Sequence, residues 1–384
     1  MLVQVSSAIE PSRNSRRERG LLHHEGRNTL SMGCSHCLDK MVCGGLQVDS
    51  PVFDCLSLCC ENPTNCDSVC RRKPIQFAQR VREVQGFELH NVARASVVNA
   101  PPIPNLVPTI LHGKKRAGRF CGAPTVCLPL YDVIARHDGV IRYADARNLA
   151  DGYRLSLDAR VILTGTATDP PLERWWSLGG SGRRENIRAI RGLGVTLVTT
   201  PNFSLFTDRP RWDDLHSMKR IAIVHEEFVG EGMPAALHLN ARTDQDWQRW
   251  TDYIRTRSEV THVAFELATG AGHAGRIRWH IEHLVQLAGD VNGPLHLVIR
   301  GGGRWLPALV KAFSDVTMLD TSAFVKTMKR QRAMLRGKTA IRWIPAPTDK
   351  SEPVDALLAD NWRTVAAAYQ SAFDQKPPKL KAAG

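Results

Sequence analysis

Short apolar runs, each followed by a stretch with helical periodicity, repeat along most of this chain. Strand starts that lie about 20 to 40 residues apart, with a helix between them, are typical of parallel β/α units, because a parallel neighbour is reached only through a long crossover. The apolar runs are Thr125–Leu130, Arg160–Thr164, Val195–Thr200, Ala235–Leu239, His262–Leu267, Leu295–Ile299 and Thr317–Leu319. The helix-compatible stretches are Arg183–Arg191, Trp212–Phe228, Asp244–Arg257, Gly275–Ala288 and Trp305–Ser314. The pattern predicts the α/β class.

The number of these runs favours a TIM-like barrel, possibly an incomplete one. Near-continuous apolar strands fit a parallel sheet that is covered on both faces. Seven or eight units over about 210 residues fit a closed or partly closed barrel better than a short doubly wound sheet. An open sheet is the alternative, because no strand is evident between Ile141 and Arg160.

Composition divides the chain into five segments. The first is polar and lacks hydrophobic periodicity, so we expect it to be disordered, with Met32 as an alternative translation start. The third contains four prolines within eight residues, which helical geometry does not accommodate. The segments are a disordered extension (1–31), a cysteine-rich metal-binding head (32–74), a connecting or wrapping arm (75–123), the barrel (124–345) and a C-terminal helix with a tail (346–384).

Eight of the ten cysteines are crowded near the start of the chain. They are Cys34, Cys37, Cys43, Cys55, Cys59, Cys60, Cys66 and Cys70. Thiolates at such density are typical ligands of Zn²⁺ or of iron–sulfur clusters. A disulfide framework is the alternative, but the N-terminus lacks the apolar core and the cleavage site of a secretory signal. We therefore expect reduced cysteines, a cytoplasmic location, and either zinc or an iron–sulfur cluster as the cofactor.

The spacing of the cysteines leaves the metal open. Cys55-x-x-x-Cys59-Cys60 lacks the last interval of the radical-SAM motif, and neither the bacterial ferredoxin run nor a pair of C-x2-C zinc knuckles is present. Eight thiolates could hold two zinc ions, or one cluster and one zinc.

Polar side chains follow the predicted strands, at the edge where parallel β/α proteins gather their functional groups. Many of them are also preferred helix N-caps, which is the alternative reading. Glu266 differs, because it ends an apolar run, and a buried carboxylate is costly unless it is paired or used. We expect Glu266 to act as an acid/base group, with an internal ion pair to an arginine such as Arg300 or Arg242 as the alternative. The predicted catalytic pocket consists of Asn202, Asn240, Glu266 and Asp320, among strand-end residues that also include Thr166, Ser204, Arg242 and Thr269.

A glycine-rich segment after the run Leu295–Ile299 is a candidate anion site. Arg300, Gly301, Gly302 and Gly303 would let backbone N–H groups approach a phosphate. The segment matches neither a Walker loop nor the spaced glycines of dinucleotide sites, and a flexible strand-to-helix turn is the alternative.

Two histidines share one face of a predicted helix. His280 and His283 are three residues apart, but no third metal ligand is evident, so we expect them to be ordinary surface histidines of an amphipathic helix.

The formal net charge of +13 favours partners that carry phosphate, and a solvated basic surface is the alternative. One hypothesis is a metalloprotein that binds or acts on a phosphate-bearing ligand. The other is a nucleic-acid-binding protein without catalysis, in which the cysteine head is structural. No stretch approaches the roughly 18 apolar residues of a membrane span, so we expect no membrane partner.

The chain also resembles a poorly characterised group of bacterial and phage proteins known only as a domain of unknown function. The resemblance depends on Gly33-Cys34-x-x-Cys37, the run from Cys59 to Cys70, the prolines from Pro101 to Pro108, and Thr200-Pro201-Asn202-Phe203-Ser204. It implies a cysteine-rich head joined to TIM-barrel-like repeats, and it implies no particular activity.

Overall fold

A computed structural model of the chain describes residues 29–30, 47–48, 74–135, 139–205, 211–269, 274–291, 293–337, 340–349 and 351–374. All eight cysteines of the head lie outside these residues, as does most of the segment predicted to be disordered. Two short strands from the described N-terminal residues, β1 (Thr29–Leu30) and β2 (Gln47–Val48), pair antiparallel. The predicted metal ligands and the predicted disorder stay predictions.

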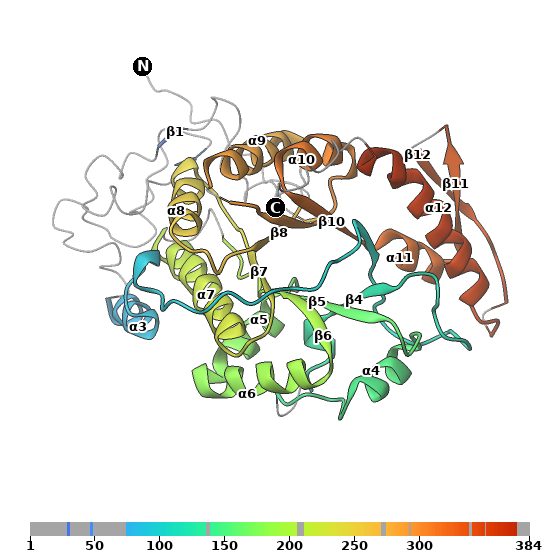
Figure 1. Ribbon diagram of the computed structural model, residues 1–384, viewed down its shortest axis with the longest axis horizontal. Helices are drawn as coiled ribbons and strands as arrows, with labels where there is room; N and C mark the ends of the chain where they lie inside the picture. Colours follow the sequence, from blue (N-terminus) through green and yellow to red (C-terminus); the bar gives the residue numbers. More distant parts are fainter. Residues whose placement is uncertain are drawn as a thin grey trace, which may run out of the picture.

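Eight parallel strands form one barrel-shaped sheet, in the order β3-β10-β9-β8-β7-β6-β5-β4 (Figure 1). The sheet is nearly closed, because Thr109 just beyond β3 bridges to Cys127 of β4, and the Ile110 N–H donates to the Cys127 carbonyl at 2.8 Å. The strands are β3 (Leu106–Pro108), β4 (Thr125–Pro129), β5 (Arg160–Thr164), β6 (Val195–Thr199), β7 (Ala235–His238), β8 (His262–Glu266), β9 (His296–Arg300) and β10 (Asp315–Asp320).

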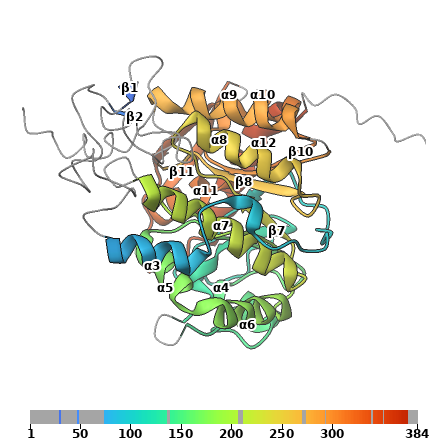
Figure 2. The same ribbon diagram turned by 90° about the vertical axis from the view of Figure 1, so that its left-hand side faces the viewer.

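Helices surround the sheet on its outer side (Figures 1 and 2). The larger hydrophobic cluster lies between them and the strands, so the strands are buried on both faces. The helices are α3 (Pro74–Val84), α4 (Ala146–Tyr153), α5 (Asp169–Ser177), α6 (Gly179–Gly192), α7 (Arg211–Gly230), α8 (Asp244–Arg255), α9 (Ala274–Asp290), α10 (Leu306–Ala312), α11 (Ser322–Met328) and α12 (Asp355–Phe373), with single 3-10 turns at Leu89–Asn91, Leu130–Asp132 and Gly303–Trp305.

Local capping explains where α8 begins. The Thr243 hydroxyl accepts from the Asp246 N–H at 3.2 Å, and the Asp246 carboxylate accepts from the Thr243 N–H at 3.1 Å. This reciprocal capping box satisfies two N–H groups that the first helical turn leaves without partners. It fixes the start of the helix close to the end of β7.

A second apolar cluster fills the barrel interior with one side chain from each strand. Its members are Val107, Cys127, Ile162, Leu197, Ala236, Ala264, Val298 and Leu319. Side chains alternate along a strand, so residues two positions further along each strand also face the interior, at the carboxyl end. By this rule His238, Glu266 and Arg300 lie above Ala236, Ala264 and Val298.

The amino-terminal end of the barrel is covered by the proline-rich part of the arm. Ala100 and Ile103 pack against the interior cluster. The Thr317 hydroxyl donates to the Pro104 carbonyl at 2.9 Å, and His296 Nε2 lies 2.9 Å from the same hydroxyl. This end is therefore closed by a polypeptide segment with a defined hydrogen-bond network.

The predicted α/β barrel is confirmed, and the open sheet is excluded. All seven predicted strand runs match β4 to β10, and the five helix-compatible stretches match α6 to α10. The eighth strand, β3, lies inside the segment predicted as the arm, because three residues that end in a proline give no period-two signal. Among the described residues, no helix is long and apolar enough to cross a membrane.

Candidate functional site

A cavity of about 240 Å³ opens at the carboxyl ends of β5 to β8. His280 of α9 completes its wall. Its polar lining includes seven residues that the sequence places at strand ends: Thr166, Asn202, Ser204, Asn240, Arg242, Glu266 and Thr269. Three of the four predicted catalytic residues therefore line one cavity.

Asn202 and Asn240 touch each other in this cavity. Asn240 Nδ2 donates to Asn202 Oδ1 at 3.0 Å and lies 3.1 Å from the Phe203 carbonyl. The Asn202 N–H donates to the Gly165 carbonyl at 3.2 Å. Gly165 permits this approach, because a Cβ there would lie 2.5 Å from the Thr199 carbonyl oxygen. The two amides thus have fixed positions, and they still offer polar atoms toward the cavity.

Glu266 forms an internal ion pair with Arg300, its partner in the β8–β9 register. The carboxylate also accepts from the Ala268 N–H at 2.6 Å and from the Thr166 hydroxyl. Burial raises the pKa of Glu266, while the Arg300 guanidinium and these hydrogen bonds act in the opposite direction. The geometry is that of the internal pair, and the acid/base role stays a prediction.

The glycines after Arg300 are explained by packing. Gly301 and Gly302 have positive φ angles of 83° and 72°. A Cβ at Gly301 would lie 2.7 Å from the Ala268 nitrogen, and a Cβ at Gly303 would lie 2.6 Å from the ring of Tyr369. Bare backbone is needed at these positions without any ligand, and Arg300 itself is paired with Glu266. The predicted anion-holding role of this segment gains no support from its geometry.

Asp320 is directed toward the start of α11. Its carboxylate accepts from the Ser322 hydroxyl at 2.6 Å and from the Ala323 N–H at 2.9 Å, which is a helix-capping arrangement. Burial raises the pKa of Asp320, and these hydrogen bonds lower it. Asp320 is thus apart from the other three predicted catalytic residues.

Two residues of α9 that sequence reasoning did not select stand beside or in the cavity. His280 lines it with 2% of its surface exposed, and neither ring nitrogen has a hydrogen-bond partner. The prediction of a surface histidine is therefore wrong for His280, because this face of α9 packs against Phe265 of β8 at a ring distance of 5.1 Å. Burial lowers the pKa of His280 well below its ordinary value, so the ring is neutral.

Arg276 lies one helical turn before His280 and is fully buried. Its Nε and Nη1 have no hydrogen-bond partner, and its Nη2 lies 3.5 Å from the Arg242 carbonyl. Its guanidinium carbon is 4.3 Å from the ring centre of Trp279, a cation–π contact. Burial and the Arg242 charge lower the pKa of Arg276 to about 9, so the group is still cationic at neutral pH.

The glycine spacing just before α9 is a sequence signal for this region. Gly270, Gly272 and Gly275 have the Gly-x-Gly-x-x-Gly spacing, and they follow a strand run and precede a helix. Residues 270–273 lie outside the described residues, so the site is defined without them. The spacing would nevertheless have directed attention to Arg276, the next residue along the chain.

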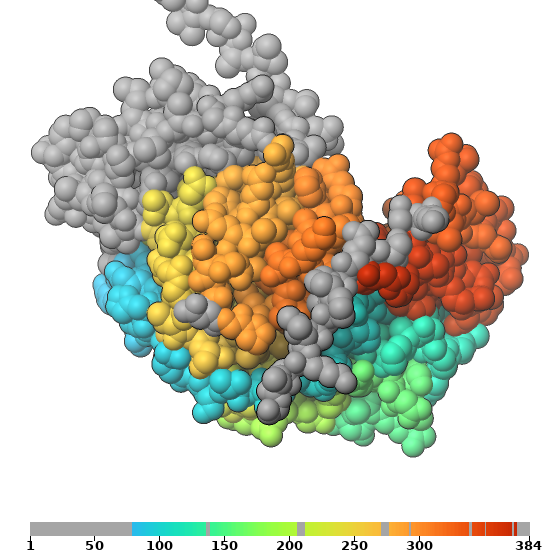
Figure 3. Space-filling model, turned by 45° about the horizontal axis from the view of Figure 1, so that its top comes forward, coloured from blue at the N-terminus to red at the C-terminus, as the bar shows by residue number. Residues whose placement is uncertain are grey.

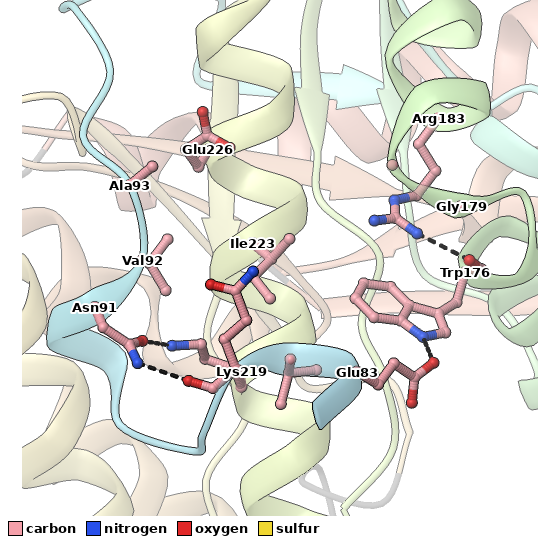
Figure 4. A pocket seen from close by; sticks show the side chains of 13 residues that line it. Glu83, Asn91, Val92, Ala93, Trp176, Gly179, Arg183, Lys219, Ile223 and Glu226 are labelled. Carbon is pink, nitrogen blue, oxygen red and sulfur yellow. Dashed lines mark hydrogen bonds between the residues drawn. The ribbon is translucent and has the colours of Figure 1, made fainter. Parts of the chain in front are cut away.

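A second cavity, of about 360 Å³, lies outside the barrel between α3, α6 and α7 (Figure 4). Its polar groups are paired with one another. Lys219 donates to Asn91 Oδ1 and to the Glu88 carbonyl, and the Trp176 indole donates to Glu83. The Lys219 bonds connect the segment after α3 to α7, and the Trp176 bond connects α5 to α3, so we assign this cavity a structural role.

Within the described residues, no group of three or more histidine, cysteine, aspartate or glutamate side chains could hold a metal ion. Both described cysteines, Cys121 and Cys127, are free thiols, and Cys127 belongs to the interior cluster of the barrel. No protein-family model matches this chain, and no curated protein matches it.

Proposed function

We propose that this protein binds a small phosphate-bearing ligand in the cavity at the carboxyl end of its barrel. The observation that carries the proposal is Arg276, a fully buried guanidinium with two nitrogens that lack hydrogen-bond partners. Burial of an unpaired charge costs several kcal/mol, so buried cations in proteins are paired or bind an anion. Arg276 is not itself in the cavity lining, but it lies beside Arg242 and one helical turn before His280, which both line it. It forms no ion pair with any described residue, and Asp244 and Asp246 act on its charge only from a longer distance, so an anion bound against this wall would satisfy it.

The residues that line the cavity suit the same ligand. Arg242 lowers the pKa of Arg276 by its proximity, so two cations converge on this region. Planar guanidinium groups are well matched to phosphate oxygens. Asn202, Asn240 and the neutral imidazole of His280 add uncharged polar groups that would orient the remainder of the ligand. The cavity is smaller than typical sites for drug-sized molecules, which favours a small phosphomonoester.

Glu266 is the proposed proton-transfer group, should the ligand be a substrate. It lines the same cavity, and burial raises its pKa toward the range where a carboxyl group exchanges protons at neutral pH. Its pair with Arg300 opposes this shift. Because the proposal assigns anion binding to the arginines and proton transfer to Glu266, Glu266→Gln should retain ligand affinity.

Isothermal titration calorimetry with inorganic phosphate and with glycerol 3-phosphate tests the binding proposal. Arg276→Met should weaken binding by about 10- to 100-fold, since charge-assisted hydrogen bonds contribute about 1.5 to 3 kcal/mol. Arg278→Met is the matched control, because Arg278 lies on the same helix, is exposed and pairs with Glu282 at 2.8 Å. Equal affinities in the two variants, or no binding by the wild-type protein, would refute the proposal.

We also propose that the cysteine-rich head binds zinc or an iron–sulfur cluster in a reducing, cytoplasmic environment. The support is the sequence alone, namely the density of the thiols from Cys34 to Cys70. Anaerobic purification followed by metal analysis and a visible absorption spectrum would separate the two metals, because iron–sulfur clusters are coloured and zinc is not. Preparations without stoichiometric iron or zinc would contradict it.

A further inference from the structure

A two-stranded antiparallel ribbon follows the last barrel strand and its helix α11. Its strands are β11 (Gln331–Arg336) and β12 (Ala340–Pro345). It lies at the edge of the molecule beside α12 (Figures 1 and 3). We call it the basic ribbon.

The basic ribbon has one face toward the protein and one face toward solvent. Ala333 is buried, and its N–H donates to Asn361 Oδ1 of α12 at 2.7 Å. Alternation along β11 therefore directs Arg332, Met334 and Arg336 to the opposite, outer face. Arg342 of β12 is the register partner of Met334, so it belongs to the same outer face.

The three outer-face arginines are exposed, and they form no ion pair or hydrogen bond with any residue that the structure describes. Along the ribbon, the Met334–Arg342 pair lies between Arg332 and Arg336, and each step is two residues, or about 7 Å. Every charged residue from 321 to 348 is a lysine or an arginine. The ribbon therefore presents a row of positive charges without local neutralisation.

Asn361 makes the ribbon a rigid element. Besides accepting from Ala333, it donates to the Gln331 carbonyl and to the Thr327 hydroxyl, both at 2.8 Å, and it is completely buried. The base of the ribbon is thus fixed to α11 and α12 before any partner binds. Such preorganisation reduces the entropy cost of binding.

We propose that the outer face of the basic ribbon binds the phosphate backbone of double-stranded DNA. A two-stranded ribbon fits the major groove of B-DNA, and arginine is the side chain best suited to bidentate contacts with phosphate. A membrane surface fits less well, because membrane-bound elements place several aromatic and large aliphatic residues on the contacting face, whereas the outer face here has Met334 among three arginines. Trp343, the tryptophan of the ribbon, is the register partner of Ala333 and lies on the inner face.

Fluorescence anisotropy with a labelled DNA duplex of arbitrary sequence tests the proposal on the full chain. The test variant carries Arg332→Gln, Arg336→Gln and Arg342→Gln. The control variant removes the same charge at three exposed positions elsewhere, with Arg147→Gln, Arg174→Gln and Lys311→Gln. Circular dichroism and the thermal midpoint verify that both variants are folded.

The ribbon variant should bind at least about tenfold more weakly than the wild-type protein between about 50 and 200 mM salt. Its slope of log affinity against log salt should fall by about 2 to 3, because each neutralised phosphate contributes about 0.9. The control variant should change by less than about twofold. The single variant Arg342→Glu, at the centre of the row, should weaken binding even if the triple variant folds poorly.

Three results would overturn the proposal. They are equal losses of affinity in the ribbon and control variants, absence of DNA binding by the wild-type protein, and binding to vesicles of anionic phospholipid but not to DNA. Arg276→Met should leave DNA affinity unchanged, so failure of this proposal is distinguishable from failure of the small-ligand site.

Discussion

Each end of the barrel has a pair of histidines, and the two pairs differ in whether their ring nitrogens have hydrogen-bond partners. At the amino-terminal end, the rings of His262 and His296 stack with centroids 4.7 Å apart. Each has a hydrogen-bond partner, since His262 Nδ1 lies 2.9 Å from the Thr261 hydroxyl and His296 Nε2 lies 2.9 Å from that of Thr317. His262 and His296 are half-buried, whereas His238 and His280 at the carboxyl end are each 2% exposed, and none of the ring nitrogens of His238 and His280 has a partner.

The difference shows that the amino-terminal end of the barrel satisfies its polar groups with hydrogen bonds, whereas the carboxyl end leaves some of them available to a ligand. A buried polar group without a hydrogen bond costs about 1 to 3 kcal/mol. The amino-terminal end avoids that cost through the arm, which supplies the Pro104 carbonyl to Thr317. The carboxyl end retains it at two imidazoles and at the Arg276 guanidinium. We interpret the unpaired groups as ligand-binding groups.

The largest effect is expected from breaking the buried Glu266–Arg300 ion pair at the carboxyl end of the barrel. Arg300→Met leaves the Glu266 carboxylate buried without its cation, which should cost about 3 to 5 kcal/mol of unfolding free energy in urea. The double variant Arg300→Met with Glu266→Gln should recover a large part of this loss. If the double variant is as unstable as the single one, the charge pair is not what Arg300 contributes.

Acidification should destabilise both ends by a comparable amount for each buried histidine. Burial lowers the pKa of His238 to about 3 and that of His262 to about 4. Because these values lie below the unfolded value near 6.5, the unfolded chain takes up protons first, and stability is lost as the pH falls below about 6.5. Each histidine should contribute on the order of 1 to 2 kcal/mol between pH 7 and pH 5.

Urea unfolding at pH 7 and pH 5 measures this dependence. His238→Leu should reduce the pH dependence by the contribution of one histidine. An unchanged slope in that variant would mean that His238 is already protonated, or is solvated, in the folded protein.

The Thr317 hydroxyl at the amino-terminal end should contribute to the unfolding free energy through two contacts. Thr317→Val removes the group that donates to the Pro104 carbonyl and pairs with His296. Each of these two contacts should contribute about 0.5 to 1.5 kcal/mol, so we expect a total loss of about 1 to 3 kcal/mol in unfolding free energy. Thr317→Ser keeps the hydroxyl and serves as the control. Equal losses in the two variants would assign the effect to the methyl group.

The smallest effect is expected from removing an unpaired imidazole at the open end. His280→Leu deletes no hydrogen bond and places an apolar side chain among Phe265, Trp247 and Trp279. The thermal midpoint should be unchanged or slightly raised, by the equivalent of at most about 1 kcal/mol. A clear destabilisation would show that His280 already has a partner, and the contrast between the two ends would disappear.

The barrel could be predicted from the sequence, because its strands are buried on both faces and therefore appear as continuous apolar runs. The cavity was partly accessible for a related reason, since the carboxyl ends of parallel strands meet at one edge, where Asn202, Asn240 and Glu266 come together. The pairing of Glu266 with Arg300 was foreseen as an alternative, because the two residues end neighbouring strands.

The other features of the site could not be predicted from the sequence, because they depend on packing between distant segments. Asp320 could not be assigned to its helix cap until the position of Ala323 relative to its carboxylate was known. Whether Arg276 has a partner depends on other β/α units, as its contact with the main-chain carbonyl of Arg242, 34 residues earlier, shows. The strand β3 was hidden because it is short and ends at Pro108. A pattern in one segment carries no information on such contacts.

The most direct test of the account is the unfolding free energy of the wild-type protein and of Arg276→Met, each with and without glycerol 3-phosphate. Without ligand, the variant should be at least as stable as the wild-type protein, because it lacks an unpaired buried charge. With ligand at 100 times the wild-type dissociation constant, the wild-type protein should gain about 2.7 kcal/mol, and the variant, which binds about 10- to 100-fold more weakly, should gain only about 0.4 to 1.4 kcal/mol. A variant that is strongly destabilised without ligand, or that gains as much stability as the wild-type protein, would contradict the assignment of Arg276 to an anion site.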